Sequence, residues 1–452
     1  MNTSLLRLAA TSAIAAACLS ACGGGGGGGA PTSVAAQTVI TNPTTPTNPT
    51  NPTTPTNPTT PTDPTTPTNP TTPTDPTTPV TPINPTNPIV PTIPVIQFGT
   101  ASVSIAGEPG CGFDSVNLTI TKLRFNMDAA ATDASPGWTD ITLAAPRRID
   151  TAQLRNGASL TLGTAALLPG HYGQARIVID ANSNNTTTNS VVVAGTSTEI
   201  PLLTQTPAPE GIVYSNGFDI ANGQALNLVV DVDSCRSIVP NNSTYLLRPA
   251  IGTVPSAKNG INGFIDKALV GRNVRVTAQQ NGVVIRASLV DPLTGEFNLA
   301  RLPAGSYDVV ITANGSAAAV VSGVAVVDGT AVVALSSAAA PIALDASSTG
   351  TINANLSLVP ASTVMAPFGS ALESFDGGPQ VTLGYRMANL ATGNVQFANL
   401  PVSRPMLAVW QSGQPLVWNR NATITPGAGV YTIAASAPGY TTTRTLPFPA
   451  GG

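Results

Sequence analysis

Few residues in this chain have the types and spacing that chemistry requires, and the cysteines come first among them. Cys22 follows Leu19, Ser20 and Ala21 at the end of the apolar N-terminal segment. Cys111 and Cys235 stand far from it, in the body of the chain. In an exported protein these two thiols predict one disulfide, because the compartment is oxidising. Two unpaired, buried thiols are the alternative.

Two aspartates near Cys235 have the spacing of oxygen ligands. Asp231 and Asp233 lie two residues apart at the end of a predicted strand, so both carboxylates can face the same side. With Asp180 or Asp114 they would form a Ca²⁺ site. The alternative is that they cap the turn into Cys235 by accepting hydrogen bonds from backbone N–H groups. No other cofactor is predicted.

Aromatic residues near the C-terminus form a second kind of candidate site. Trp410, Trp418 and Tyr431 lie close together in the sequence. Exposed aromatic rings are amphipathic and can stack on the faces of sugars, which predicts ligand binding. Packing into a hydrophobic core is the alternative for the same residues.

Catalysis has little support in this sequence. His171, the only histidine, lies in a Pro-Gly turn, where exposure to solvent is expected. There is no HExxH motif, nucleophile elbow or phosphate-binding glycine loop that would bring acid, base and nucleophile together. We therefore predict that the protein is not an enzyme and has no catalytic residues. A glycosidase that uses two carboxylates from distant strands is the alternative, since motifs would not reveal it.

The composition predicts an all-β fold. Charged residues make up 9% of the chain, and Gly and Pro number 42 each, whereas about 25% charged residues is usual in soluble proteins. This mixture favours short strands and turns over helices, and 452 residues suffice for two or three domains. With a net charge of −3 and only three lysines, no basic surface can neutralise a phosphate backbone, which excludes nucleic acid as a partner.

The N-terminal segment has the features of an export signal. Residues 1–7 give a positive start, and residues 8–19 form an apolar stretch too short to span a membrane. With the Leu-Ser-Ala-Cys sequence that ends at Cys22, the segment resembles the lipobox of bacterial lipoproteins. The resemblance implies removal of the leader 1–21, acylation of Cys22 and, from Gly23, sorting to the outer membrane. An ordinary signal peptide is the alternative.

Residues 22–96 are expected to be a spacer. Seven glycines follow Cys22, and from about residue 42 the chain repeats hexapeptides of the type Asn-Pro-Thr-Thr-Pro-Thr. Frequent proline without large apolar residues cannot form a core, so we expect a disordered, extended linker that holds the folded part away from the membrane. Recognition of the proline-rich tract by a partner is the alternative.

Residues 97–256 show the alternation of a β-rich domain. Apolar residues over 116–125 change phase once, which predicts a bulge at Thr121 or Lys122, and residues 226–232 form the clearest strand. The domain resembles an uncharacterised family of bacterial lipoprotein domains, catalogued as a domain of unknown function. The residues that carry the resemblance are 111–116, 137–138, 149–150, 168–172, 176–180, 231–238 and 247–249. Family membership implies a β-rich extracytoplasmic module and no particular activity.

Residues 257–343 are predicted to form a β-sandwich. Thr294-Gly295 is expected to be a hairpin turn, Phe297 is expected to point into the core, and Tyr307 to return on the same face. This segment resembles the carboxypeptidase regulatory-like, carbohydrate-binding-like sandwich. The resemblance implies a fold that serves as spacer, adhesive repeat or sugar binder.

Residues 344–452 are predicted to form a second, diverged sandwich. Residues 392–401 match 294–303 with a spacing of 98 residues. Residues 403–405 (Ser-Arg-Pro) then replace the return that contains Tyr307, and we expect residues 430–433 to supply it later.

The expected function follows from these parts. We predict an exported lipoprotein, anchored to the outer membrane, that acts as a non-catalytic binding or adhesion module. Its expected partners are the membrane, through the anchor, and a polysaccharide or a surface protein. A purely structural display or spacer lipoprotein is the alternative.

Overall fold

The chain folds almost entirely as β-strands, as its composition predicts. The computed structural model describes residues 5–9, 34–38, 40–41, 96–107, 111–182, 186–204, 211–214, 217–248, 251–254, 256–257, 259–329, 331–442 and 446–450. Its only helical elements within these residues are one short α-helix, α1 (Ser234–Ser237), and two 3₁₀ turns, η1 (Thr151–Gln153) and η2 (Lys267–Leu269). No helix of the described residues is long and apolar enough to cross a membrane.

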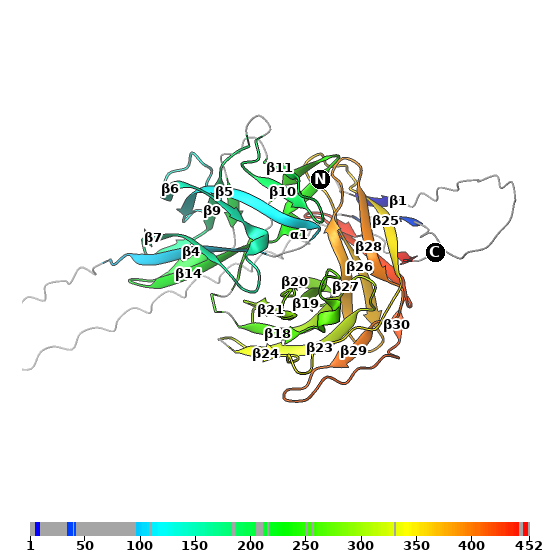
Figure 1. The fold of residues 1–452 in the computed structure, drawn as a ribbon. Helices are drawn as coiled ribbons and strands as arrows, with labels where there is room; N and C mark the ends of the chain where they lie inside the picture. Colours follow the sequence, from blue (N-terminus) through cyan, green and yellow to red (C-terminus); the bar gives the residue numbers. More distant parts are fainter. Residues whose placement is uncertain are drawn as a thin grey trace, which may run out of the picture. The chain divides into compact units, whose positions relative to one another are not determined.

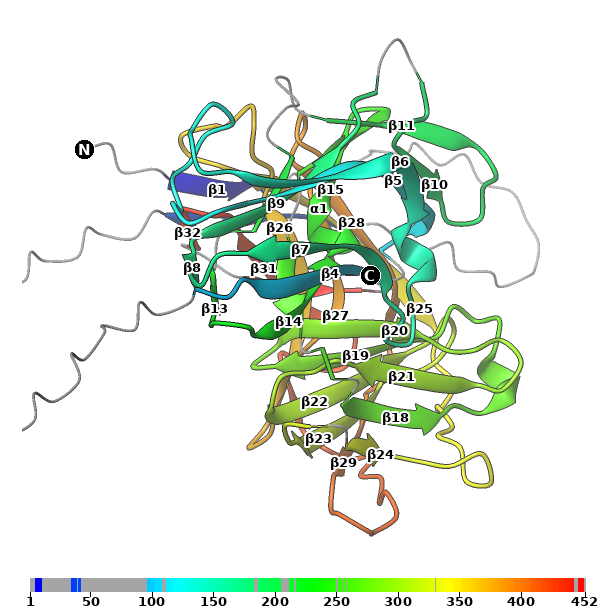
Figure 2. The ribbon, with the colours of Figure 1, turned by 90° about the vertical axis from the view of Figure 1, so that its left-hand side faces the viewer.

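The first domain is a sandwich of two sheets (Figures 1 and 2). The larger sheet runs in the order β12 (Ile212–Tyr214), β9 (Gln174–Ile179), β5 (Phe113–Asn126), β10 (Ser190–Val193), β11 (Glu199–Leu203), β16 (Thr244–Leu247) and β15 (Ile238–Asn241), and β6 (Thr139–Asp150) also pairs with β5. The facing sheet runs β17 (Ile251–Val254), β14 (Ala225–Val232), β4 (Gly99–Gly107) and β7 (Leu160–Leu167). Two further short strands, β8 (Gly170–Tyr172) and β13 (Phe218–Ile220), form an antiparallel pair.

Alternation along β5 explains how this core forms. Val116, Leu118 and Ile120 are buried, and so are Leu123 and Phe125 after a change of phase. The register with both neighbouring strands shifts between Ile120 and Lys122, which confirms the predicted bulge. The bulge keeps apolar side chains on the core side along the full length of the strand.

The second domain pairs a three-stranded sheet with a five-stranded sheet. The first runs β21 (Glu296–Ala300), β18 (Gly260–Phe264) and β24 (Val332–Ala334), and the second β20 (Val283–Leu289), β19 (Arg275–Gln280), β22 (Gly305–Thr312), β23 (Ala319–Val326) and β29 (Met406–Val409). Phe297 is fully buried and Tyr307 nearly so, as predicted. Thr294-Gly295 does form a turn, but β20 and β21 belong to different sheets, so the expected hairpin is in fact a connection between the two sheets.

The third domain repeats the second. One sheet runs β27 (Gln380–Met387), β26 (Phe368–Phe375), β31 (Val430–Ser436) and β33 (Leu446–Pro449), with β30 (Ile424–Thr425) on β26. The other contains β25 (Thr349–Ser357) and β28 (Asn394–Pro401), and β32 (Thr441–Thr442) lies at its end. Gly295 and Gly393, 98 residues apart, both have positive φ, and at each a Cβ would collide with a carbonyl oxygen of the opposite strand.

A pair of tyrosines confirms the repeat and shows where it is interrupted. The Tyr307 hydroxyl donates to the Pro303 carbonyl oxygen at 2.7 Å, and the Tyr431 hydroxyl donates to the Pro401 carbonyl oxygen at 2.6 Å. Pro401 lies 98 residues after Pro303, but Tyr431 comes 26 residues later than that spacing requires. The return strand is therefore delayed to β31, as predicted, by an insertion.

The insertion crosses from the third domain to the second. Its strand β29 pairs in parallel with β23, from Ala319 opposite Met406 to Ser322 opposite Val409. The segment closes on itself through two backbone hydrogen bonds between Leu407 and Asn419. We call residues 406–419 the arm. It consists of β29 and the loop drawn in orange that follows this strand (Figures 1 and 2). The predicted boundary at 343/344 therefore does not separate two independent sheets.

Strands of the N-terminal segment also pair with the third domain. Their bounds are β1 (Leu5–Ala9), β2 (Val34–Thr38) and β3 (Ile40–Thr41), and β1 and β2 both pair with β25. The strand β1 lies in the leader that the predicted cleavage before Cys22 would remove. Cys22 itself and the repeats over 42–95 lie outside the described residues.

Candidate functional site

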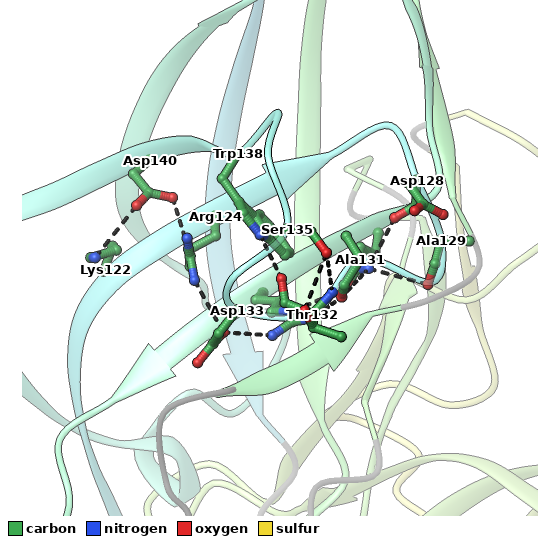
Figure 3. A network of polar contacts seen from close by, with 12 residues as sticks. Lys122, Arg124, Asp128, Ala129, Ala131, Thr132, Asp133, Ser135, Trp138 and Asp140 are labelled. Carbon is green, nitrogen blue, oxygen red and sulfur yellow. Dashed lines mark hydrogen bonds and ion pairs between the residues drawn. The ribbon is translucent and has the colours of Figure 1, made fainter.

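A polar network in the first domain holds the loop between β5 and β6 (Figure 3). Oδ1 of Asp133 forms ion pairs with Nη1 of Arg124 at 3.0 Å and with Nη1 of Arg176 at 2.8 Å. The Trp138 ring lies over both guanidinium groups, with its centroid 4.4 Å and 4.5 Å from their carbons. Asp140 pairs with Arg124 at 2.9 Å as well. The ring is thus held in place by cations and is a structural part of the loop.

The sequence did not predict that polar side chains of β9 are buried. Arg176 is 4% exposed and Gln174 is 1% exposed, although they alternate along the strand with the core residues Ile177 and Ile179. The Gln174 side-chain amide donates to the carbonyl oxygens of Asp128, Ala129 and Ala131, and its oxygen accepts from Arg176. The loop covers this face of the sheet, so polar side chains are buried there with partners. Arg176 and Trp138 belong to the residues that carry the family resemblance.

Three of the four aspartates considered for a Ca²⁺ site accept hydrogen bonds from backbone N–H groups. Asp233 caps α1, accepting from the backbone N–H groups of Cys235 and Arg236, as the capping alternative predicts. Asp114 accepts from Gly195 N and Asp180 from Ala181 N. No group of three potential metal-ligating side chains occurs among the residues that the structure describes.

Asp231 has a different partner, on the second domain. Its Oδ2 lies 2.9 Å from Nη1 of Arg286, and both side chains are about nine-tenths buried. Close by, Arg301 donates to the Ser256 carbonyl oxygen at 2.6 Å and to the Ser159 hydroxyl at 3.1 Å. These contacts satisfy charges that burial would otherwise make costly, and they join the first domain to the second.

The predicted disulfide between Cys111 and Cys235 is present, with a Cα–Cα distance of 5.2 Å. It packs in a small buried cluster with Tyr385, and Val284 and Phe368 lie against that cluster. The cluster thus combines residues of all three domains. We call it the junction.

His171 is exposed, as predicted, but it lies in strand β8 and not in a turn. Its Nδ1 lies 2.9 Å from Oδ1 of Asp219 on β13, and both side chains are largely open to solvent.

The aromatic residues near the C-terminus separate into two places. Tyr431 is fully buried in the third core, so stacking on a ligand does not fit it, and core packing does. Trp410 and Trp418 lie on the arm, half-buried against the second core. Beside them Val409 is 65% exposed and Val417 is 79% exposed. The arm thus places apolar surface in solvent next to two indoles.

A cleft lies against the junction, between the first and third domains. Its volume is about 660 Å³, and apolar side chains form most of its wall. Two arginines, Arg236 and Arg248, also line it. We call it the junction cleft. The sequence does not predict this cleft, because its first-domain residues and its third-domain residues lie more than one hundred positions apart.

These features define the class of protein first: an all-β chain of tandem sandwich domains. Residues 98–249, within the first domain, match the model of a family described as a domain of unknown function (DUF4382). No curated protein matches the chain. A Streptococcal ancillary pilin is similar over 78% of this chain and 96% of its own, with 9% identity and a TM-score of 0.16. So remote a likeness carries no argument about function.

A buried acid in the third domain gives a test of this packing. Glu373 on β26 is 1% exposed, and neither carboxyl oxygen has a hydrogen-bond partner among the described residues. Burial raises the pKa of Glu373 to about 8, so the folded protein holds the proton more tightly than the unfolded chain does. The stabilising contribution is complete below about pH 4.5 and declines as pH rises toward 8, by at most about 1.4 kcal/mol per pH unit.

We therefore expect Glu373→Gln to flatten this part of the stability profile. The free energy of unfolding, measured by denaturant titration at intervals between about pH 5 and pH 8, falls with pH in the parent protein and falls less in the variant. Glu296→Gln, at a partly exposed position on β21, is the matched control and keeps the parent slope. Parallel profiles for the parent and Glu373→Gln would contradict the burial of a neutral acid.

Proposed function

We propose that this chain is an exported, lipid-anchored protein of the cell envelope that binds a saccharide through its arm and catalyses no reaction. The observation that carries the proposal is the insertion in the third domain. The third domain keeps the glycine turn and the tyrosine hydrogen bond of the second domain. It differs from the second domain by the insertion that contains the arm. Loops held on a rigid scaffold are common places for binding residues.

The geometry of the arm suits an uncharged, partly apolar ligand. Its strand is fixed to β23, and the backbone N–H of Trp410 donates to the Ser322 carbonyl oxygen at 2.9 Å. The turn that follows, from Gln411 to Gln414, adds two exposed amide side chains to the same arm. Rigid rings together with amide donors and acceptors match the apolar faces and hydroxyl edges of a sugar. Trp138 does not suit this role, since the two arginines occupy its ring face.

Display without recognition is the second candidate, and a different observation favours it. The three domains are held together by β29, by the Asp231–Arg286 ion pair and by the junction. A rigid body of this kind, placed behind a proline-rich spacer, would extend a stalk whether or not it binds a ligand. The two candidates differ only in whether the arm recognises a ligand.

Binding by the arm is tested on a glycan array with the purified full-length protein. We expect repeatable binding that is reduced at least tenfold by Trp410→Ala or Trp418→Ala, because loss of the ring removes the stacking surface. Trp410→Phe and Trp418→Phe retain an aromatic face and should bind nearly as the parent does. Thermal unfolding of each variant is the control, and it tests whether the second core, against which both indoles pack, stays intact. An array without binding would favour display.

The anchor is tested separately, on Cys22. Cells fed a labelled fatty acid should incorporate it into the parent protein and into Cys18→Ser, but not into Cys22→Ser. Intact mass of the native protein should correspond to a chain that begins at an acylated Cys22. A mature protein without acyl groups, cleaved at another position, would refute the anchored part of the proposal.

A further inference from the structure

The junction cleft has the size of a small-molecule site, and side chains of two domains form its wall. Val239 comes from the first domain, and Met365, Phe368 and Met387 come from the third. Its volume of about 660 Å³ falls within the range of roughly 300–1,000 Å³ that is typical of ligand pockets. Methionine side chains adapt their shape, so this wall can pack against a flexible aliphatic chain.

The charge at the cleft comes from two arginines whose partners differ. Arg236 Nε lies 3.4 Å from Oδ2 of Asp233, and its guanidinium carbon lies 4.9 Å from the centroid of Phe368. Nε of Arg248 is buried, and it makes no hydrogen bond with any described residue. Burial lowers the pKa of Arg248, but a guanidinium remains a cation at neutral pH. Asp233 thus partly neutralises Arg236, whereas the Nε of Arg248 has no hydrogen-bond partner among the described residues.

The balance of charge selects the kind of anion. Asp233 offsets part of the charge of Arg236, so the cleft presents little more than one net positive charge. A dianion such as a phosphate would be left partly uncompensated beside apolar walls, at a high desolvation cost. A carboxylate carries a single charge, and guanidinium groups bind it with well-defined geometry.

We propose that the junction cleft binds a small monocarboxylate with an aliphatic chain. The carboxylate accepts hydrogen bonds from Arg248 and Arg236, and the chain packs against Met365, Met387 and Phe368. The site is separate from the arm and does not depend on saccharide binding. Because its walls come from two domains, the ligand also stabilises their contact, and it raises the melting temperature of the protein.

Calorimetric titration of the full-length protein with decanoate, below its micelle concentration, tests the proposal. Decanol, which has the same chain without the charge, and acetate, which has the charge without the chain, are the matched ligands. We expect decanoate to bind at least tenfold more tightly than either, since a charged hydrogen bond and the buried chain each contribute more than about tenfold. Decanoate should also raise the melting temperature.

Two charge variants make the result specific to the cleft. Arg248→Gln should weaken decanoate binding at least tenfold, whereas Arg272→Gln, at an exposed position of the second domain, should leave it unchanged. Equal binding of decanoate and decanol would overturn the role of the arginines. Equal binding by the two variants, or no binding of decanoate by a folded parent protein, would overturn the site. None of these results bears on the glycan array.

Discussion

The Cys111–Cys235 bridge, with the aromatic side chains packed on it, is the contact on which the described structure depends. It closes a loop of 124 residues, and loop-closure entropy predicts a stabilisation of about 5 kcal/mol for a loop of that size. Tyr385 and Phe368 of the third domain and Val284 of the second lie against the two cysteines. A bond within one domain therefore also provides the surface on which the other two meet.

Contacts near the bridge position the residues of the junction cleft and hold the three domains together. Arg236 follows Cys235 directly in α1, so the cap by Asp233 that forms this short helix also places a guanidinium at the junction cleft. The Asp231–Arg286 ion pair and the hydrogen bonds of Arg301 hold the second domain to the first. The arm in turn ties the third domain to the second through β29. Removing any one of these contacts would loosen a junction that the others share.

Local features were predictable from the sequence because their causes are local. The change of phase in β5 predicted a bulge, the 98-residue spacing predicted a repeat, and the two cysteines in the body of the chain predicted a disulfide; the structure contains all three. The capping alternative for Asp233 also rested on its immediate neighbours, and it is what the structure shows.

The remaining features depend on contacts between distant segments. The burial of Gln174 and Arg176 was not predicted, because the sequence of β9 does not indicate that the loop 127–138 folds over it. Trp410 and Tyr431 looked like neighbours in the sequence, yet the insertion sends one to the second core and leaves the other in the third. The junction cleft combines segments around Arg236, Phe368 and Ser436, whose proximity no periodicity encodes.

The claim that one bridge organises all three domains is tested most directly by hydrogen exchange. Amide exchange is followed in the oxidised protein and in the same protein after reduction and alkylation of Cys111 and Cys235. We predict faster exchange in β20, β26 and β27, which contribute Val284, Phe368 and Tyr385 to the junction, as well as in the strands next to the cysteines. Faster exchange confined to the first domain, with β20, β26 and β27 unchanged, would contradict the account.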